Sequence, residues 1–223
     1  VAGNPRPEFR PDATYLITGG LGGMGLRVAR WLVERGARHL LLLGRSGLPP
    51  RASWKRLSGD ASPDSAKISA ILALERLGAN VHLGSVDIAE ESEVAAVLEQ
   101  FAAEAWPPIR GVFHLAGVFE DRLTGDMTPE IFRRVLRPKV AGTWSVFQQL
   151  REAALDFFVS FSSAASVFGS IGGSNYAAAN SFLDTFAHYL AQRGIRTLSV
   201  NWGPWEEIGM AVVQQRSSKL SKQ

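Results

Sequence analysis

The sequence predicts an α/β fold built on one doubly wound, parallel sheet. Apolar runs rich in β-branched and aromatic residues alternate with segments of helical periodicity along the chain. A glycine-rich turn joins the first apolar run to the first helical segment. The chain has 223 residues, of which 46% are hydrophobic, and this is enough to bury one full core but short for two. We therefore expect a single domain.

Six strands and five helices account for most of the sequence. The strands are expected at residues 15–18, 39–43, 81–86, 112–116, 157–161 and 197–202, each separated from the next by a helical pattern. The helices are expected at residues 24–35, 65–77, 91–104, 129–152 and 175–193, the fourth with a break near Pro138. Strands that alternate with helices in this way run parallel, because each helix carries the chain back across the sheet.

The remaining segments are polar or rich in proline and glycine. Residues 1–13 contain a proline-rich stretch and are expected to form a lead-in or linker, so that the domain covers residues 14–211. Residues 45–64 are rich in serine, glycine and proline and predict a long surface loop. Residues 212–223 form a polar tail without a further strand pattern. We expect a sheet that lacks its last edge strand and a chain cut within a lid region.

The composition argues against several classes of function. The chain has no cysteine, which excludes thiol chemistry and fits a cytoplasmic location. Its four histidines are not paired at metal-ligand spacing, so no metal is expected, and His114 is expected to be a buried residue at a strand end. The net charge of +3 is small and the basic residues are dispersed, which does not indicate nucleic-acid binding. We expect neither a membrane segment nor a secretory signal.

The glycine-rich turn after the first strand has the spacing of a dinucleotide-binding motif. Gly20, Gly22 and Gly25 follow the pattern Gly-x-Gly-x-x-Gly and lead directly into a helical segment. Glycines allow the backbone to approach a pyrophosphate closely, and the start of the helix supplies free N–H groups and a favourable dipole. In this context the motif predicts a Rossmann-like cofactor site that includes Thr18 and Leu21. The alternative is a turn that is merely flexible.

The end of the second strand indicates which dinucleotide is bound. An enzyme that uses NAD carries an acidic side chain here to hold the ribose 2′-hydroxyl, whereas this chain has Arg45 followed by Ser46. A guanidinium matches a 2′-phosphate in charge and in geometry, so the predicted cofactor is NADPH. The alternative for Arg45 is a solvated loop residue.

Two further strand ends are expected to contribute to the cofactor site. Asp87 and Ile88 follow the third strand, and the Asp87 carboxylate can accept a hydrogen bond from the adenine amino group. Ala116 and Gly117 follow the fourth strand, where small residues let the chain pass close to the cofactor. Plain turn chemistry explains either pair equally well.

A phenol and a hydroxyl are expected on either side of a reducible carbonyl. Ser163 falls at the exit of the fifth strand, where open α/β sheets bind ligands. Tyr176 begins the last predicted helix, and Asn180 lies one turn later on the same face. This arrangement predicts ketone reduction, although a serine pair and a helix that starts with tyrosine also occur in ordinary proteins.

These residues resemble the short-chain dehydrogenase/reductases, and among them the ketoreductase domains of modular polyketide synthases and of the related animal fatty acid synthase. The resemblance covers about residues 15–211. Most members of the superfamily carry Tyr-x-x-x-Lys, whereas here Asn180 takes the lysine position and Lys139 lies in an upstream segment, residues 137–143. This exchange is typical of the polyketide and fatty acid synthase branch. Other matching stretches are residues 112–117, 161–163, 180–184 and 201–205.

The resemblance implies a role for each member of this set. Tyr176 donates the proton, and Ser163 hydrogen-bonds the developing alkoxide. Lys139 lowers the pKa of the tyrosine. Both side chains contact the cofactor, and Lys139 does so at the nicotinamide ribose. Asn180 helps to hold the lysine and a proton-relay water.

The resemblance also assigns roles to residues near the end of the chain. Pro204 and Trp205 match a turn that packs against the nicotinamide, and residues 206–211 match the start of a lid helix over the substrate.

The function that the resemblance implies is NADPH-dependent reduction of a β-ketoacyl thioester on an acyl carrier protein, within a multifunctional polyketide synthase. The partners are the phosphopantetheine-linked chain and neighbouring synthase domains. Two alternatives are a non-catalytic NADP-binding structural domain of a synthase and a free-standing reductase of small ketones. The complete catalytic set argues against the first, and the lysine/asparagine exchange argues against the second.

The resemblance further implies a stereochemical outcome. B-type ketoreductases carry a Leu-Asp-Asp motif after the fourth strand, where this chain has Phe119, Glu120 and Asp121. The other branch carries a tryptophan eight residues before the tyrosine, where this chain has Phe168. The B-type pattern is the better match. Because no proline follows at the second place after Tyr176, the non-epimerising subgroup is expected, with a D-configured (3R) alcohol as product.

Overall fold

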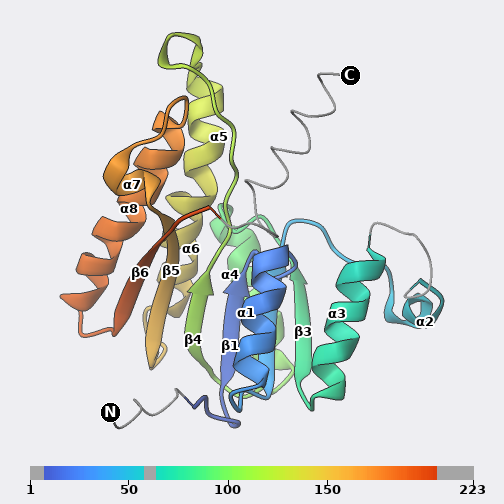
Figure 1. Ribbon diagram of the computed structural model, residues 1–223. Coiled ribbons are helices and arrows are strands. Elements are labelled where there is room, and N and C mark those ends of the chain that lie inside the picture. Colours follow the sequence, from blue (N-terminus) through green and yellow to red (C-terminus); the bar gives the residue numbers. More distant parts are fainter. Residues whose placement is uncertain (1–7, 58–63, 205–223) are drawn as a thin grey trace, which may run out of the picture.

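Residues 8–57 and 64–204 are described by the computed structural model. Their six strands form one parallel sheet in the order β3-β2-β1-β4-β5-β6 (Figure 1). The strands are β1 (Thr14–Thr18), β2 (His39–Gly44), β3 (Asn80–Ser85), β4 (Ile109–His114), β5 (Phe157–Ser163) and β6 (Thr197–Trp202). The predicted α/β class and doubly wound, Rossmann-like sheet are confirmed.

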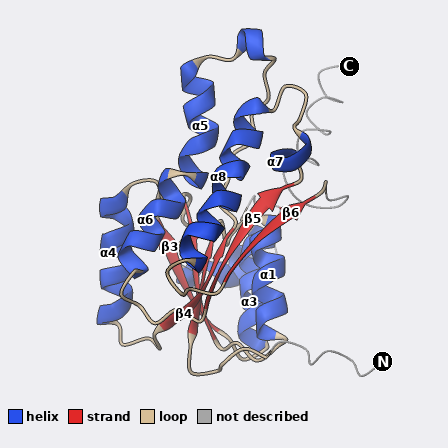
Figure 2. Ribbon diagram, turned by 90° about the vertical axis from the view of Figure 1, so that its left-hand side faces the viewer, coloured by secondary structure: helices blue, strands red, loops and turns tan. Residues whose placement is uncertain are grey.

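Helices cover both faces of the sheet. The longer ones are α1 (Gly23–Val33), α3 (Ser65–Arg76), α4 (Glu91–Ala103), α5 (Pro129–Lys139), α6 (Ala141–Leu150) and α8 (Ser174–Ala191). Short helical turns are η1 (Arg51–Ser53), α2 (Trp54–Leu57), η2 (Thr124–Asp126) and α7 (Ala165–Phe168). Figure 2 shows α1 and α3 on one side of the strands and α4, α6 and α8 on the other. Within the described ranges, no helix has both the length and the apolar character needed to cross a membrane.

The central strands are apolar along their whole length because both faces of the sheet are buried. In β1, Tyr15 and Ile17 pack into the core beneath α1 and α3, whereas Leu16 packs into the core beneath α4, α6 and α8. The four consecutive leucines of β2, residues 40–43, alternate between the two cores in the same way and are 0% exposed. This two-sided burial fixes the register of the strands, and with it the positions of the loops at their carboxyl ends.

The predicted helix over residues 129–152 is divided into two. α5 ends at Lys139 and α6 begins at Ala141, so the break falls at Val140, two residues after Pro138. Proline has no N–H to donate to the preceding turn, which weakens the helix at this point. Thr143 Oγ1 donates a hydrogen bond to the Lys139 carbonyl across the break. In Figure 1, α5 rises beyond the carboxyl ends of the strands, beside α8.

The prediction of one long surface loop over residues 45–64 is wrong for residues 51–57, which form η1 and α2. Trp54 is 3% exposed and belongs to the core beneath α1 and α3. Its Nε1 donates to the Pro49 carbonyl at 2.7 Å. One buried aromatic side chain with a satisfied N–H therefore holds this segment, and a single residue of this kind leaves no periodic signal in the sequence.

The segment before β1 packs against the sheet. The Phe9 ring lies edge-on to Tyr15 and Trp31, with ring centres 5.2 and 5.1 Å apart respectively. The backbone N–H of Arg10 donates to the Tyr15 hydroxyl at 2.8 Å. Residues 8–13 of the predicted lead-in are thus part of the packed structure, and residues 1–7 lie outside the described residues.

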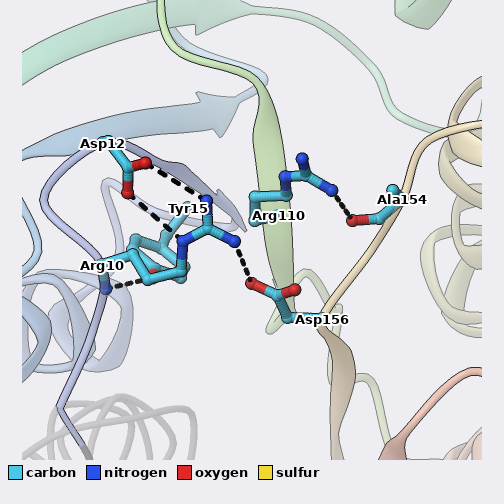
Figure 3. Close-up of polar contacts among 6 residues, drawn as sticks. All are labelled: Arg10, Asp12, Tyr15, Arg110, Ala154 and Asp156. Carbon is cyan, nitrogen blue, oxygen red and sulfur yellow. Dashed lines mark hydrogen bonds and ion pairs between the residues drawn. The ribbon is translucent and has the colours of Figure 1, made fainter.

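Charged side chains connect this segment to the start of β5 (Figure 3). The Arg10 guanidinium pairs with Asp12 at 3.2 Å and with Asp156 at 3.7 Å. On β4, Arg110 donates to the Ala154 carbonyl at 2.6 Å. All of these contacts lie at the amino ends of the strands.

Candidate active site

A cleft of about 820 Å³ opens at the carboxyl ends of the strands. The loops after all six strands contribute to it, together with α5 and α8. It lies where the strand order reverses between β1 and β4, the usual ligand site of such sheets. Predicted site residues that line the cleft are Leu21, Gly22, Gly25, Arg45, Ser46, Asp87, Ile88, Ala116, Gly117, Phe119, Lys139, Ser163, Phe168, Tyr176 and Pro204.

The glycine-rich loop has no room for side chains at two of its positions. A Cβ at Gly20 would lie 2.8 Å from the Ile17 carbonyl oxygen, and a Cβ at Gly25 would collide with the Gly19 backbone. Gly22 is the N-cap of α1, and no side chain caps this end of the helix. The N–H groups of the first turn are therefore left for a ligand. This cradle fits the pyrophosphate of a dinucleotide.

Two cationic side chains line the cleft near the ends of β2 and α3. Arg45 and Ser46 are both exposed, as a contact with a ligand phosphate requires. Lys67 of α3 also lines the cleft, and its Nζ lies 2.9 Å from an Asp64 carboxylate oxygen. Sequence reasoning missed Lys67, because a single lysine on a helix is indistinguishable from an ordinary surface residue.

The loop after β3 is held by turn chemistry and by an ion pair. The Asp87 carboxylate accepts the Ala89 N–H at 3.0 Å and pairs with Arg137 of α5 at 2.9 Å. These contacts match the turn alternative that the sequence left open for Asp87. Ile88 packs against Gly142 of α6 so closely that a Cβ atom added to this glycine would lie 2.7 Å from the Ile88 side chain. The loop is thereby attached to both helices on either side of the break.

α8 presents Tyr176 and Asn180 on one face, one turn apart. Asn180 is 0% exposed, and its Nδ2 donates to the Tyr176 carbonyl at 2.7 Å. Its Oδ1 is buried and has no hydrogen-bond partner among the described residues. Burial raises the pKa of the Tyr176 hydroxyl, while contacts from the Ser163 and Asn180 side chains act in the opposite direction. The phenol is therefore protonated at neutral pH.

Lys139, the last residue of α5, extends into this group and is 2% exposed. Its Nζ donates to the Phe161 carbonyl at 2.9 Å and lies 5.9 Å from the centre of the Tyr176 ring. Burial lowers the pKa of Lys139 to about 7, and the Asp184 carboxylate acts against this shift. The structure thus brings together the four predicted catalytic residues, which come from α5, β5 and α8.

His114 is buried beside the lysine, as the sequence predicts. Thr18 Oγ1 accepts the N–H groups of Leu115 and Ala116, each at 3.2 Å, and is hydrogen-bonded to His114 Nδ1 at 2.9 Å. Burial, and then the nearby charge of Lys139, lower the pKa of His114 to about 3. Thr18 thus connects the glycine loop to the end of β4 without contacting the cleft directly.

Phe119 and Phe168 both line the cleft. The Phe119 ring is edge-on to the Tyr176 ring, with centres 4.9 Å apart. Phe168 of α7 is 86% exposed and lines the same cleft. α7 follows β5 directly and is too short for its periodicity to be detected in the sequence.

The neighbours of Phe119 fix its loop. The Glu120 carboxylate pairs with Arg134 of α5 at 2.9 Å. The backbone carbonyl of Glu120 accepts a hydrogen bond from Asn175 Nδ2 at 2.9 Å. Asp121 lies close to Gly172: a Cβ atom added to this glycine would be 3.6 Å from the Cβ atom of Asp121. Glu120 therefore connects the loop to α5 through its carboxylate and to the start of α8 through its backbone carbonyl. Trp205, the lid segment 206–211 and the tail 212–223 lie outside the described residues.

Sequence reasoning also singled out neither Asp184 nor Asn201, whose side chains are hydrogen-bonded to each other at 2.9 Å. Both lie in stretches that match the ketoreductases, but no role was expected for either. Asp184 falls eight residues after Tyr176 and four after Asn180, so helical spacing alone places it on the same face of α8. That spacing is the signal from which it could have been found.

The fold and the cleft together are those of the short-chain dehydrogenase/reductase class. Residues 13–207 match the model of the KR domain family, and the chain therefore belongs to that family. The 6-methylsalicylic acid synthase of Penicillium patulum is 42% identical over 206 residues, 92% of this chain and 11% of that protein. A phenolphthiocerol/phthiocerol polyketide synthase from Mycobacterium tuberculosis H37Rv is 41% identical over 212 residues, 95% of this chain and 11% of that protein.

Solved structures show the same relationship. A ketoreductase domain from the bacillaene assembly line is 35% identical with a TM-score of 0.80, and the match covers 99% of this chain and 51% of that one. A structure of A-type ketoreductases from a modular polyketide synthase is 36% identical with a TM-score of 0.81, covering 100% of this chain and 44% of that one. The chain thus spans about a tenth of its curated relatives and about half of these structures. The predicted relationship to the ketoreductase domains of polyketide synthases is confirmed.

Replacing Lys139 by methionine is expected to stabilise the fold at neutral pH. In the folded protein the pKa of Lys139 is lowered to about 7, whereas in an unfolded chain a lysine has a pKa of about 10.4. Between these values the unfolded chain binds more protons, so the free energy of unfolding of the native chain rises with pH across this window. The Lys139→Met variant lacks this rise and is expected to be more stable at pH 7, by on the order of 2–4 kcal/mol.

Urea unfolding at several pH values between 7 and 10 measures this difference. It is expected to be largest near pH 7 and to shrink toward pH 10. Lys67→Met, which removes a lysine that is 32% exposed in its side chain, is the matched control and is expected to show no such trend. A constant difference between Lys139→Met and the native chain at all pH values would contradict the assignment.

Proposed function

We propose that this domain uses NADPH to reduce a β-ketoacyl thioester, carried on the phosphopantetheine arm of an acyl carrier protein, to the β-hydroxyacyl thioester in polyketide biosynthesis. The observation that carries the proposal is the buried Lys139 beside Tyr176, in the same cleft as the glycine-rich loop. Membership of the KR domain family supports the reaction class. The much longer synthases among its relatives support a carrier-bound substrate and neighbouring synthase domains as partners.

The residues present fit the cofactor. The close-packed glycines and the uncapped start of α1 suit a pyrophosphate, and the exposed Arg45 suits a 2′-phosphate. We assign the cradle to Gly20, Gly22 and Gly25, and the phosphate contact to Arg45 with Ser46. Bound in this cleft, NADPH supplies the hydride that reduces the carbonyl carbon.

The chain itself supplies the proton and the electrostatic stabilisation. Tyr176 is protonated at neutral pH, since the ordinary pKa of a tyrosine is about 10 and burial raises it, and it donates this proton to the carbonyl oxygen. The phenolate that forms is stabilised by the Lys139 ammonium next to the ring. Ser163 donates a hydrogen bond to the oxygen as its charge develops. The unpartnered Oδ1 of Asn180 fits a role in holding the lysine and a relay water, since a buried amide oxygen without a partner is costly.

The proposal is tested with a β-ketoacyl N-acetylcysteamine thioester, following NADPH oxidation. The native chain is expected to turn over, and Tyr176→Phe is expected to lose at least about a hundredfold in kcat because it removes the acid and keeps the ring. NADPH affinity, measured by fluorescence, is expected to stay within about twofold. Tyr189→Phe, on the same helix but away from the cleft, is the control. No turnover with NADPH or NADH would favour the structural, non-catalytic alternative, and loss of NADPH binding in Tyr176→Phe would make the tyrosine structural.

Arg45→Ala is expected to narrow the preference for NADPH over NADH. The guanidinium makes a charge-assisted contact to the 2′-phosphate that NADH lacks, and a contact of this kind contributes about 1–3 kcal/mol. The ratio of kcat/KM values for the two cofactors measures the change, with Arg133→Ala as the control because Arg133 does not line the cleft. If the ratio is unchanged, the 2′-phosphate is bound elsewhere, and Lys67 is the next residue to replace.

The alcohol is expected to be D-configured, with any α-substituent left as it arrives. Phe119, Glu120 and Asp121 match the B-type pattern better than Phe168 matches the tryptophan of the other branch, and Phe119 contacts the ring of the acid. Chiral chromatography of the product from a β-ketoacyl thioester gives the configuration. A predominantly L-configured alcohol would overturn the assignment and make Phe168 the residue that determines the side of entry.

A further inference from the structure

A polar network lies directly behind Ser163, centred on the Asp184 carboxylate of α8. Asp184 Oδ2 accepts hydrogen bonds from Ser166 Oγ at 2.6 Å and from Asn201 Nδ2 at 2.9 Å, and Oδ1 accepts one from Ser199. Ser166 belongs to α7, whereas Asn201 and Ser199 belong to β6. The Asp184 carboxylate therefore joins its own helix, α8, to α7 and β6 near the end of β5.

The same donors hold the turn at which the chain leaves β5. Ser166 Oγ lies 2.9 Å from the Ser163 carbonyl oxygen, and Asn201 Nδ2 lies 3.3 Å from it and 3.3 Å from Ser162 Oγ. Ser163 Oγ accepts the Ala165 N–H at 3.2 Å. One hydroxyl proton and two amide protons cannot serve all of these acceptors at once, so the donors are shared among them. The atoms on both sides of the Ser163 side chain are thereby fixed.

The Asp184 carboxylate is charged in this setting. Burial acts to raise the pKa of Asp184, but the hydrogen bonds from Ser166, Ser199, Asn201 and Ser162 together lower it below its usual value. A carboxylate that accepts several hydrogen bonds is a strong anchor, because each bond to a charged acceptor is stronger than one between neutral groups.

We propose that Asp184 and Asn201 are positioning residues for the ketoreduction. They hold the Ser163 turn against α8, and the Asp184 charge helps to keep Lys139 as an ammonium. This inference rests on the proposed function of Ser163, Tyr176 and Lys139. Because Tyr176 and Asp184 share one face of a single helix, that helix sets the distance between the proton donor and the anchor of the serine. Small displacements of groups around a reacting carbonyl cost much of the rate.

Within the part of the chain that the structure describes, three titratable side chains lie near Lys139. His114 of β4 is neutral because burial, with the charge of Lys139, lowers its pKa to about 3. Tyr176 of α8 is neutral because burial raises its pKa. Asp184 of α8 is charged, and it acts against the burial that lowers the pKa of Lys139. Of these three, Asp184 is thus the group that favours the ammonium form.

Two variants separate the geometric effect from the charge effect. Asp184→Asn keeps the shape and removes the charge, whereas Asn201→Ala removes one of the two side-chain donors to the Ser163 carbonyl and keeps the charge. Thr185→Ala is the control, because Thr185 lies next to Asp184 on α8 but donates to the Ser181 carbonyl of its own helix. Each variant is examined for the pKa of Lys139 by carbon-13 NMR of labelled lysine, for kcat on the thioester and for NADPH affinity. The chain has five lysines, and Lys139→Arg identifies the signal.

Asp184→Asn is expected to lower the pKa of Lys139 by about half a unit or more. Asn201→Ala is expected to leave that pKa in place and to lower kcat by about tenfold or more, with NADPH affinity changed less than twofold. An unchanged lysine pKa in Asp184→Asn overturns the charge effect, and native kcat in Asn201→Ala overturns the geometric effect.

If Asp184→Asn does not fold, two other variants replace it: Asp184→Glu, which retains the charge, and Ser166→Ala. Native kcat in both of these variants overturns the proposal. Because the NMR reading needs no turnover, a native chain that is inactive refutes the proposed function while the coupling of Asp184 to Lys139 is still measured.

Discussion

The arrangement of the candidate active site depends on the burial of one lysine amine, which the fold tolerates at a cost in stability. Lys139 is 2% exposed, and transfer of an ammonium out of water is costly unless polar partners surround it. Its partners are the Phe161 carbonyl, the face of the Tyr176 ring and, at longer range, the Asp184 carboxylate. A charge held in this way stabilises an anion formed beside it far more than it would in water. The energetic cost of burial is therefore the source of its chemical effect.

Several features of the fold accompany this burial. The helix break after Pro138 ends α5 at Lys139, and α6 begins at Ala141. His114 beside the lysine is neutral because burial, with the charge of Lys139, lowers its pKa to about 3, and its Nδ1 is hydrogen-bonded to Thr18 Oγ1. Thr18 also begins the glycine loop, so the lysine site and the cofactor cradle share one hydrogen-bonded connection.

Several groups at the cleft weaken the fold. Asn180 Oδ1 and His114 Nε2 are buried without a hydrogen-bond partner among the described residues. The start of α1 has no side-chain cap, and Lys139 is buried next to a second polar side chain. Each of these lowers stability, as polar groups at active sites commonly do. Buried polar atoms without a partner among the described residues also lie away from the cleft, on Arg35, His39, Arg110 and Thr197.

The sequence by itself determined the six strands, the glycine cradle after β1 and the shared face of Tyr176 and Asn180, because each of these is a local pattern set by the strand or helix period. Motif resemblance alone suggested that Lys139 acts with a tyrosine 37 residues later. Only the tertiary structure decided that this lysine is buried against Tyr176, that Trp54 turns a predicted loop into a helix, and that Asp184 and Asn201 anchor the Ser163 turn. These features depend on contacts between elements far apart in the chain, whose energies come from burial and hydrogen bonding that no local pattern records.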